Sequence, residues 1–431
     1  MIKIIKSGDF KRSSIMQRTV DSTTLNTTVA MIIANIIKRG DTALREYTEK
    51  FDGCFLDSFE ISKSAINKAV KNVKPEFVKI LERAARNIED FHRHQVQKGF
   101  DLPPKNGAVL GQIVTPIERV GIYAPGGSAS YPSSVLMNCI PAKIAGVKDI
   151  IVMTPPSKTT KADSVNGVDC KILAAIKIAG ADRVFTVGGA QAIAALAYGT
   201  EEIPRVDKIT GPGNAYVTEA KRQVFGVVGI DMIAGPSDIL IIADSSADPA
   251  LVAADMLSSC EHGSDSPAIL VTKSKAFAER VTAEIEVQLK DLPREDIARK
   301  AINEQSLIII TKTINEAFDI SNALAPEHLE ILLDEPFNYL DKVKNAGSVF
   351  MGKYSPEVLG DYYAGPNHTL PTAGTARFSS PLSVNDFTKN ISYTYYSKEA
   401  LIDASKDVIS FAEEEGLRAH ALSVQKRLDK I

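Results

Sequence analysis

The sequence predicts an α/β protein built on parallel β-sheets. Six short runs rich in apolar residues alternate with longer stretches of helical periodicity. Strands that are apolar along their whole length are typical of parallel sheets whose two faces are covered by helices. The six runs are residues 150–153, 184–187, 239–242, 268–271, 307–310 and 348–350.

The remaining segments follow other patterns. Residues 1 to about 23 are short and polar, and we expect them to form an arm rather than a domain. Apolar residues recur at three- and four-residue spacing from residue 24 to residue 97, which predicts helices. The alternation over residues 109–123 is typical of exposed-edge strands. Asp248, followed by Pro249, predicts a helix start. The end of the chain predicts a helix broken at Gly416, with one apolar face that must pack on something.

Length, composition and charge exclude several classes of protein. At ~150 residues per domain, the 431 residues correspond to roughly three domains, or to two large ones with appendages. Lys and Arg total 50 and Asp and Glu total 53, so the basic excess of a nucleic-acid binder is absent. The four cysteines are far apart and form no disulfide framework. No signal peptide is visible, and no apolar run reaches the ~18 residues of a membrane span. We therefore expect a cytoplasmic protein with a large core.

Glycine-rich loops follow several of the predicted strands. Ligands of open α/β sheets bind beyond the carboxyl ends of strands, so loops at comparable positions indicate a crevice. None of these loops is a GxGxxG fingerprint, and Pro212 is foreign to that motif. Tight turns alone would explain each loop equally well. The loops are residues 124–127, 188–191, 211–214 and 234–237.

The six histidines fall into two groups. His92 and His94 lie among charged residues of a predicted helix, where we expect them to be exposed. Each of the other four has a carboxylate within eight residues. Imidazoles and carboxylates are the groups that a zinc site and acid–base catalysis require. The candidates are His262, His328, His368 and His420.

The chain resembles the histidinol dehydrogenase family over nearly its whole length. The resemblance rests on long, ordered motifs: residues 123–127, 131–138, 188–200, 211–214, 229–232, 325–330 and 360–362. It implies oxidation of L-histidinol to L-histidine through the aldehyde, with two NAD and with Zn²⁺. It also implies a homodimer in which the C-terminal segment crosses to the partner and completes the partner's site.

The resemblance also implies roles for individual residues. His328 would be the base that takes the alcohol proton, and Glu327 would activate the water that adds to the aldehyde. His262, Asp361 and His420 would bind zinc. The cofactor would contact Tyr123, Gln191 and Asn214. The substrate would be surrounded by Ser237, Ser259, His262, His328, Asp361, His368, Glu415 and His420.

The implied fold has two intertwined Rossmann-like parallel-sheet domains that lack GxGxxG. We expect residues 24–107 and 237–381 to form a first domain carrying most of the metal and catalytic site. Residues 108–236 would form the second domain, on the cofactor side. Residues 1–23 would be an N-terminal arm, and residues 382–431 a helical C-terminal arm exchanged within the dimer.

One position departs from the family pattern. Ser259 stands where the family has a glutamine zinc ligand, three residues before His262. The serine side chain is two carbon atoms shorter, so its oxygen falls roughly 2 to 3 Å short of a ~2.1 Å ligand distance. Water could fill the gap, zinc could bind weakly until substrate orders the site, or the chain could be a paralogue. A milder departure is Asp238, where glutamate is more usual.

These observations favour a zinc- and NAD-dependent dehydrogenase of histidinol. One alternative is a relative that oxidises another polar alcohol, which a serine at the metal would suit. The other is a metal-poor relative without catalytic activity, retained for assembly.

Overall fold

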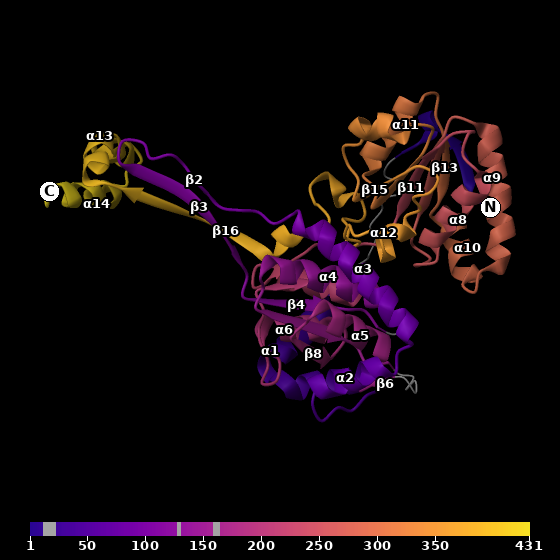
Figure 1. Cartoon of the computed structure of the whole chain (residues 1–431), viewed down its shortest axis with the longest axis horizontal. Coiled ribbons are helices and arrows are strands. Elements are labelled where there is room, and N and C mark those ends of the chain that lie inside the picture. Colours follow the sequence, from indigo (N-terminus) through magenta and orange to yellow (C-terminus); the bar gives the residue numbers. More distant parts are fainter. Residues whose placement is uncertain (12–22, 127–130, 158–163) are drawn as a thin grey trace. The chain divides into compact units, whose positions relative to one another are not determined.

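The structure is a computed structural model that describes residues 1–11, 23–126, 131–157 and 164–431. Its elements divide into two compact units (Figure 1). Unit 1 comprises Met1–Gln95 and Glu118–Phe387, and unit 2 comprises Val96–Ile117 and Thr388–Ile431. Most of the predicted arm (residues 12–22) and Gly127 of the first family motif lie outside the described residues.

Unit 1 contains a six-stranded, wholly parallel sheet in the order β1-β13-β12-β11-β14-β15. Alternate residues of each strand point to opposite faces, so both faces are apolar and each packs under helices. The strands are β1 (Lys3–Lys6), β11 (Ile239–Ala243), β12 (Ala268–Thr272), β13 (Leu307–Ile310), β14 (His328–Leu332) and β15 (Ser348–Met351). One face is covered by α8 (Pro249–Cys260), α9 (Lys275–Gln288) and α10 (Glu295–Glu304), and the other by α11 (Ile314–Leu324).

A second parallel sheet in unit 1 has five strands in the order β10-β9-β4-β5-β8. Its strands are β4 (Arg119–Tyr123), β5 (Asp149–Thr154), β8 (Arg183–Thr186), β9 (Lys208–Thr210) and β10 (Gly229–Ile230). Four helices alternate with them: α4 (Pro132–Ala145), α5 (Cys170–Ala179), α6 (Gly189–Tyr198) and α7 (Ala215–Val224). All six predicted apolar runs are strands, and the predicted α/β class with two parallel sheets is confirmed.

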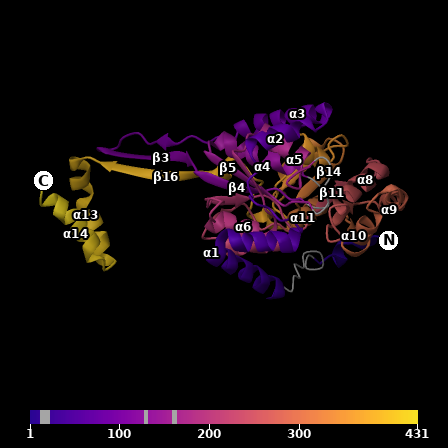
Figure 2. The ribbon, with the colours of Figure 1, turned by 90° about the horizontal axis from the view of Figure 1, so that it is seen from below.

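The N-terminal helices pack differently from the predicted domain division. α1 (Thr23–Asp52) packs on α6 and α7, and its apolar stripe joins the core of the five-stranded sheet. α2 (Lys63–Lys71) and α3 (Pro75–Arg93) pack over α4 and α5 (Figure 2). The prediction had grouped these residues with the six-stranded sheet. An amphipathic period shows that a helix is covered, but it does not show which sheet covers it.

The first strand is a second difference. β1 lies beside β13 at the edge of the six-stranded sheet, with Ile4 opposite Ile308, so the start of the chain is part of a domain core. The strand forms by pairing with that sheet, and its four residues are too few to show a strand pattern in the sequence.

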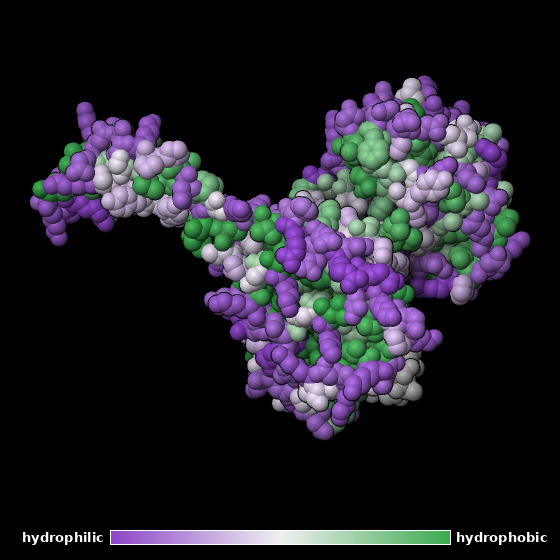
Figure 3. Space-filling model, viewed as in Figure 1, coloured by the Kyte–Doolittle hydropathy of each residue, from purple (hydrophilic) through white to green (hydrophobic). Residues whose placement is uncertain are grey.

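Unit 2 is a three-stranded antiparallel sheet followed by two helices. β3 (Ala108–Pro116) pairs along its whole length with β16 (Thr388–Tyr396) and also with β2 (Phe100–Asp101). α13 (Lys398–Glu414) and α14 (Arg418–Leu428) pack on each other, and Gly416 takes a φ of 74° between them. The predicted break is confirmed. Several apolar side chains of these helices, including Phe411 and Val408, are exposed among polar ones (Figure 3).

His92 is buried, so its predicted exposure was wrong. It continues the stripe of Leu81, Ala84 and Ile88 on α3, and its Nδ1 lies 2.7 Å from Oε1 of Gln95. The charged neighbours in sequence lie on the other face of the helix. His94 is exposed as predicted.

Across the parts of the chain that the structure describes, no helix has the length and hydropathy needed to cross a membrane.

Candidate active site

A cavity of about 240 Å³ in unit 1 gathers most of the predicted catalytic side chains. This volume is below the ~300–1,000 Å³ of pockets for drug-sized ligands, so it suits a small polar molecule. The residues that line it come from stretches far apart in sequence. The predicted site residues among them are Ser237, His262, Glu327, His328, Asp361 and His368.

The strand register brings two pairs of consecutive residues together. Ile239, the first residue of β11, lies opposite His328, the first residue of β14. Ser237 and Asp238 therefore precede one strand where Glu327 precedes the other. The acidic and basic side chains of the site thus stand at the amino edge of the six-stranded sheet.

His328 is held with one ring nitrogen toward the backbone. Its Nδ1 lies 3.1 Å from the carbonyl oxygen of Asp238. A carbonyl only accepts, so the proton is on Nδ1, and Nε2 keeps its lone pair. Burial lowers the pKa of this imidazole, but the surrounding carboxylates, led by Glu327 and Glu357, outweigh burial and raise it. The geometry gives His328 a free basic nitrogen.

Glu327 is buried beside it. Oε2 of Glu327 accepts hydrogen bonds from Oγ of Ser237 (2.7 Å) and from the backbone N–H of Asp238 (3.1 Å). Burial raises the pKa of Glu327 to about 7, so protonated and ionised forms coexist near neutral pH. Such a carboxyl group can exchange a proton with water.

Asp238 holds both residues in place. Its Oδ1 accepts the backbone N–H of Glu327 (2.9 Å), and its carbonyl faces the ring of His328. Oδ2 accepts the backbone N–H of Ala373 at 3.3 Å. The sequence singled out this position only as a mild departure, because hydrogen bonds to backbone groups leave no pattern in the sequence.

Imidazole and carboxylate groups meet around Asp361. Oδ2 of Asp361 lies 4.0 Å from Nε2 of His262, and Oδ1 lies 3.7 Å from Nδ1 of His368. Ligand atoms of His328, Glu357 and Asp361 all lie within 4.8 Å of one another. These donors are of the kind that bind zinc. Burial lowers the pKa of His368, which favours a neutral ring.

Glu357 was missed by the sequence analysis. It precedes α12 (Val358–Tyr362), four residues before Asp361, so the two carboxylates share one side of a helical turn. That spacing was the available signal, but a single glutamate before a five-residue helix forms no recognisable motif.

Three other predicted residues lie outside the cavity lining. Ser259 is buried in the last turn of α8, and no described group bonds its Oγ. Glu415 and His420 belong to unit 2, where both side chains are exposed.

The predicted cofactor residues lie at the carboxyl edge of the five-stranded sheet. Tyr123 ends β4, Gln191 is in the first turn of α6 after β8, and Asn214 caps α7 after β9. The chain passes from β4 to β5 on one side and later to β9 on the other, so the strand order reverses at β4. Ligands of doubly wound sheets bind at such a reversal.

These three side chains differ in their hydrogen bonds. The Tyr123 hydroxyl accepts the backbone N–H of Gly189 at 3.1 Å, and burial raises the pKa of Tyr123 to about 12. Asn214 accepts the backbone N–H groups of Tyr216 and Val217. Gln191 is buried, and its Nε2 has no hydrogen-bond partner among the described residues. Within the described chain, the buried amide of Gln191 therefore keeps its donor unpaired.

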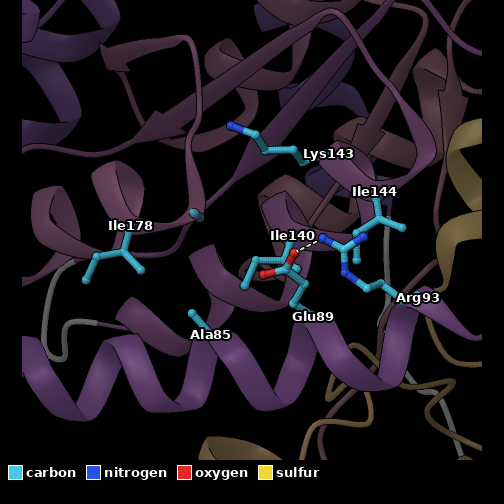
Figure 4. Close-up of a pocket in the computed structure, with 8 residues that line it drawn as sticks. Ala85, Glu89, Arg93, Ile140, Lys143, Ile144 and Ile178 are labelled. Atoms are coloured by element: carbon cyan, nitrogen blue, oxygen red, sulfur yellow. Dashed lines mark hydrogen bonds and ion pairs between the residues drawn. The ribbon is translucent and has the colours of Figure 1, made fainter.

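A second cavity, of about 350 Å³, lies among α3, α4 and α5 (Figure 4). Ile140, Ile144 and Ile178 contribute to its apolar lining, and Glu89 pairs with Arg93 beside it. None of the predicted site residues reaches it.

Known proteins resemble this chain over nearly its whole length. The family model described as histidinol dehydrogenase matches residues 15–428. A histidinol dehydrogenase from Streptococcus mutans is 52% identical over 403 residues, which cover 94% of this chain and 92% of the relative. One from Clostridium acetobutylicum is 49% identical over 432 residues and 99% of both chains. The crystal structure of histidinol dehydrogenase from Elizabethkingia anophelis matches with a TM-score of 0.93 at 39% identity, covering 100% of this chain and 98% of that one. The chain belongs to the histidinol dehydrogenase family of oxidoreductases.

Proposed function

We propose that this protein oxidises L-histidinol to L-histidine through the aldehyde, with two NAD as hydride acceptors. The observation that carries the proposal is the buried His328, whose Nε2 is free beside the carboxyl group of Glu327 at the cavity. An alcohol-to-acid oxidation needs a base for the alcohol and a second group that activates water. Family membership supports the same reaction.

In the first step, Nε2 of His328 takes the proton of the substrate hydroxyl. The Asp238 carbonyl keeps the opposite nitrogen protonated, so the ring receives the proton in a fixed orientation. The imidazolium that results is stabilised by nearby carboxylates, with Oε2 of Glu327 3.9 Å from Nδ1 and Oε2 of Glu357 4.0 Å from Nε2.

In the second step, the Glu327 carboxylate takes a proton from the water that adds to the aldehyde. Ser237 and the Asp238 amide donate to one of its oxygens and thereby fix the orientation of the group. The imidazolium of His328 gives its proton to the aldehyde oxygen as the water adds, and the neutral ring then removes a hydroxyl proton of the hydrate, as it did that of the alcohol. The same base serves both oxidations.

The donor set fits a zinc ion. His262 and Asp361 present an imidazole nitrogen and a carboxylate oxygen 4.0 Å apart, and two ligands of one ion at ~2.1 Å can be at most ~4.2 Å apart. A bound zinc would polarise the substrate oxygen and orient the substrate. We propose that His420 of the partner subunit completes the ligand set in a homodimer.

The carboxyl edge of the five-stranded sheet fits the cofactor. NAD supplies the hydride acceptor when bound. The unpartnered Nε2 of Gln191 can donate to a cofactor oxygen, and Tyr123 and Asn214 follow neighbouring strands. The glycine-rich starts of the helices allow a dinucleotide to approach the backbone closely.

Initial rates of NAD reduction test the substrate assignment. Purified protein with zinc is assayed against L-histidinol and a panel of amino alcohols and diols without an imidazole. We expect turnover of histidinol at a kcat/KM at least about 100-fold above the panel, since two unpaired polar contacts in the site amount to roughly that factor. Preferential turnover of another alcohol would instead favour the paralogue.

A further inference from the structure

We infer that Glu357 is a metal ligand in this chain and supplies the oxygen that Ser259 cannot. The inference deepens the proposed function and rests on it, because it concerns the zinc of the same site. Four observations support it: the orientation of Glu357, one of its oxygens having no hydrogen-bond partner among the described residues, the charge around it and the position of Ser259.

The two oxygens of Glu357 have different surroundings. Oε1 accepts a hydrogen bond from Oγ of Ser258 at 2.7 Å. The backbone N–H of Glu357 donates to Oε1 of Glu330 at 2.8 Å. Oε2 has no hydrogen-bond partner within the described parts of the chain, although the side chain is only 2% exposed. One oxygen therefore anchors the carboxylate and the other is open.

The open oxygen is directed toward the cluster at the cavity. It lies 4.0 Å from Nε2 of His328, and a ligand oxygen of Glu357 lies within 4.8 Å of one of Asp361. Glu357 and Asp361 are four residues apart in sequence, so a single ion beside this helical turn can contact both. Bringing both oxygens within ~4.2 Å of each other requires a shift of less than about 1 Å.

The surrounding charge favours a cation at this point. Asp255, Glu330 and Glu357 form a row of carboxyl groups, of which Glu330 and Glu357 are buried and Asp255 is partly buried, and Asp361 stands at its end. A buried carboxylate oxygen without a partner is costly, and a divalent cation removes that cost for two carboxylates at once. Among the described residues the nearby positive groups are imidazoles, whose charge depends on protonation.

Ser259 is beside this row but cannot reach the cavity. It is 1% exposed, it is not among the cavity-lining residues, and its neighbour Ser258 is the group that anchors Glu357. A longer side chain at position 259 would extend from the same turn of α8. The carboxylate of Glu357 is therefore bonded to the residue next to Ser259, whose own side chain is too short to be a ligand.

The test is zinc affinity of the purified protein, measured by chelator competition, together with the visible spectrum of the cobalt-substituted protein. We expect Glu357→Ala, which leaves no ligand atom at this position, to weaken zinc binding about 100-fold or more, since ligand loss exceeds the 10–100-fold effect of outer-shell changes, and to alter the cobalt spectrum. In that background, Ser259→Gln should restore most of the lost affinity. Glu330→Gln is the control in the same carboxyl row: its amide oxygen can still accept the N–H of Glu357, so we expect a loss of no more than about tenfold, the lower end of the outer-shell range.

Ser259→Ala keeps the inference falsifiable if Glu357→Ala does not fold. We expect Ser259→Ala to bind zinc as the unsubstituted protein does. A tenfold or greater loss would assign the ligand to Ser259, directly or through water, and would overturn the inference. Unchanged zinc affinity in a folded Glu357→Ala would overturn it as well. Neither readout requires turnover, so failure of the proposed reaction, seen as no NAD reduction with histidinol, is a separate result.

Discussion

The two sheet edges that carry the predicted site residues differ in how their buried charged groups are paired. At the carboxyl edge of the five-stranded sheet, Lys221 and Asp231 form an ion pair whose side chains are 3% and 1% exposed. Lys221 also donates to the carbonyl of Gly211, and Asp231 accepts the Gly211 amide. At the amino edge of the six-stranded sheet, carboxyl groups are buried with raised pKa values, and one oxygen each of Glu330 and Glu357 is open.

The difference separates two tasks. The closed ion pair fixes a backbone turn at Gly211, where φ is 109° and a Cβ would collide with the carbonyl oxygen of Tyr123. A rigid turn suits the binding of a large cofactor. The open carboxyl groups can gain and lose protons or bind a cation, which suits chemistry. Substitutions at the two edges should therefore have different effects.

The largest expected effect is on catalysis. His328→Gln removes the free basic nitrogen while keeping a polar side chain of similar length, and we expect kcat with histidinol to fall about 10³-fold or more. Zinc content and the KM for NAD should stay near their original values. A fall of less than tenfold would show that His328 is not the base.

The buried ion pair of Lys221 and Asp231 should affect stability rather than catalysis. Lys221→Met leaves Asp231 buried and unpaired, so we expect the free energy of unfolding to fall by about 3–5 kcal/mol in urea titrations. Lys208→Met is the matched control, because Lys208 pairs with Asp386 in a more exposed position (16% and 28%). Equal losses for both variants would show that the deeper burial of the Lys221–Asp231 pair does not increase its effect on stability.

Glu327→Gln should separate the two oxidation steps. We expect oxidation of the aldehyde to slow about 100-fold, with a smaller effect on release of the first hydride. Only the carboxylate form accepts a proton, and burial raises the pKa of Glu327 to about 7. The rate of aldehyde oxidation by the unsubstituted protein should therefore fall as the pH falls through about 7, and in Glu327→Gln only the dependence due to protonation of His328 should remain. Stopped-flow measurement of the two hydride transfers checks both points.

The open edge should also leave a signature in stability. Burial raises the pKa of Asp255 from 3.8 to about 6, so the folded state binds more protons than the unfolded state between these values. The contribution of Asp255 to stability is present below about pH 4 and is lost as the pH rises through about 6. Asp255→Asn should therefore gain about 2–3 kcal/mol relative to the unsubstituted protein between pH 4 and pH 8. A constant difference across that range in urea titrations would argue against a raised pKa of the partly buried Asp255.

The smallest expected effect is at the cofactor edge. Gln191→Ala removes the unpartnered donor, and we expect the KM for NAD to rise about tenfold with kcat changed less than twofold, as for one lost hydrogen bond. Gln223→Ala on α7 is the control, because its amide already bonds Asn26 and Glu219. A fall in kcat without a change in KM would place Gln191 with the chemistry rather than the cofactor.

Much of the fold was predictable because apolar runs report burial directly. The sequence did not predict β14, because Glu330 interrupts its apolar run. The surroundings of the buried Glu330 side chain include Asp255 and Glu357, which come from distant segments. The exposure of His92 was mispredicted from its charged neighbours, which occupy the other face of the helix. Local pattern gives the type of an element and leaves its tertiary partners undetermined.

The same division holds for the site. Motif residues such as His262, His328 and Asp361 were recognisable one by one, and the structure brings them to one cavity. The positions of Glu357 and of Asp238, which bonds the backbone of Glu327, depend on strand register and backbone hydrogen bonds. No single sequence motif shows these. The role of Ser259 likewise depends on what stands beside it.

The most direct test of the proposed function is the amount of NADH formed from a limiting quantity of L-histidinol, with product analysis. Two NADH per histidinol, with L-histidine as the product, is the result that a single base and a water-activating carboxylate in one cavity predict. No NADH in the presence of zinc, or one NADH with the aldehyde as the final product, would contradict it.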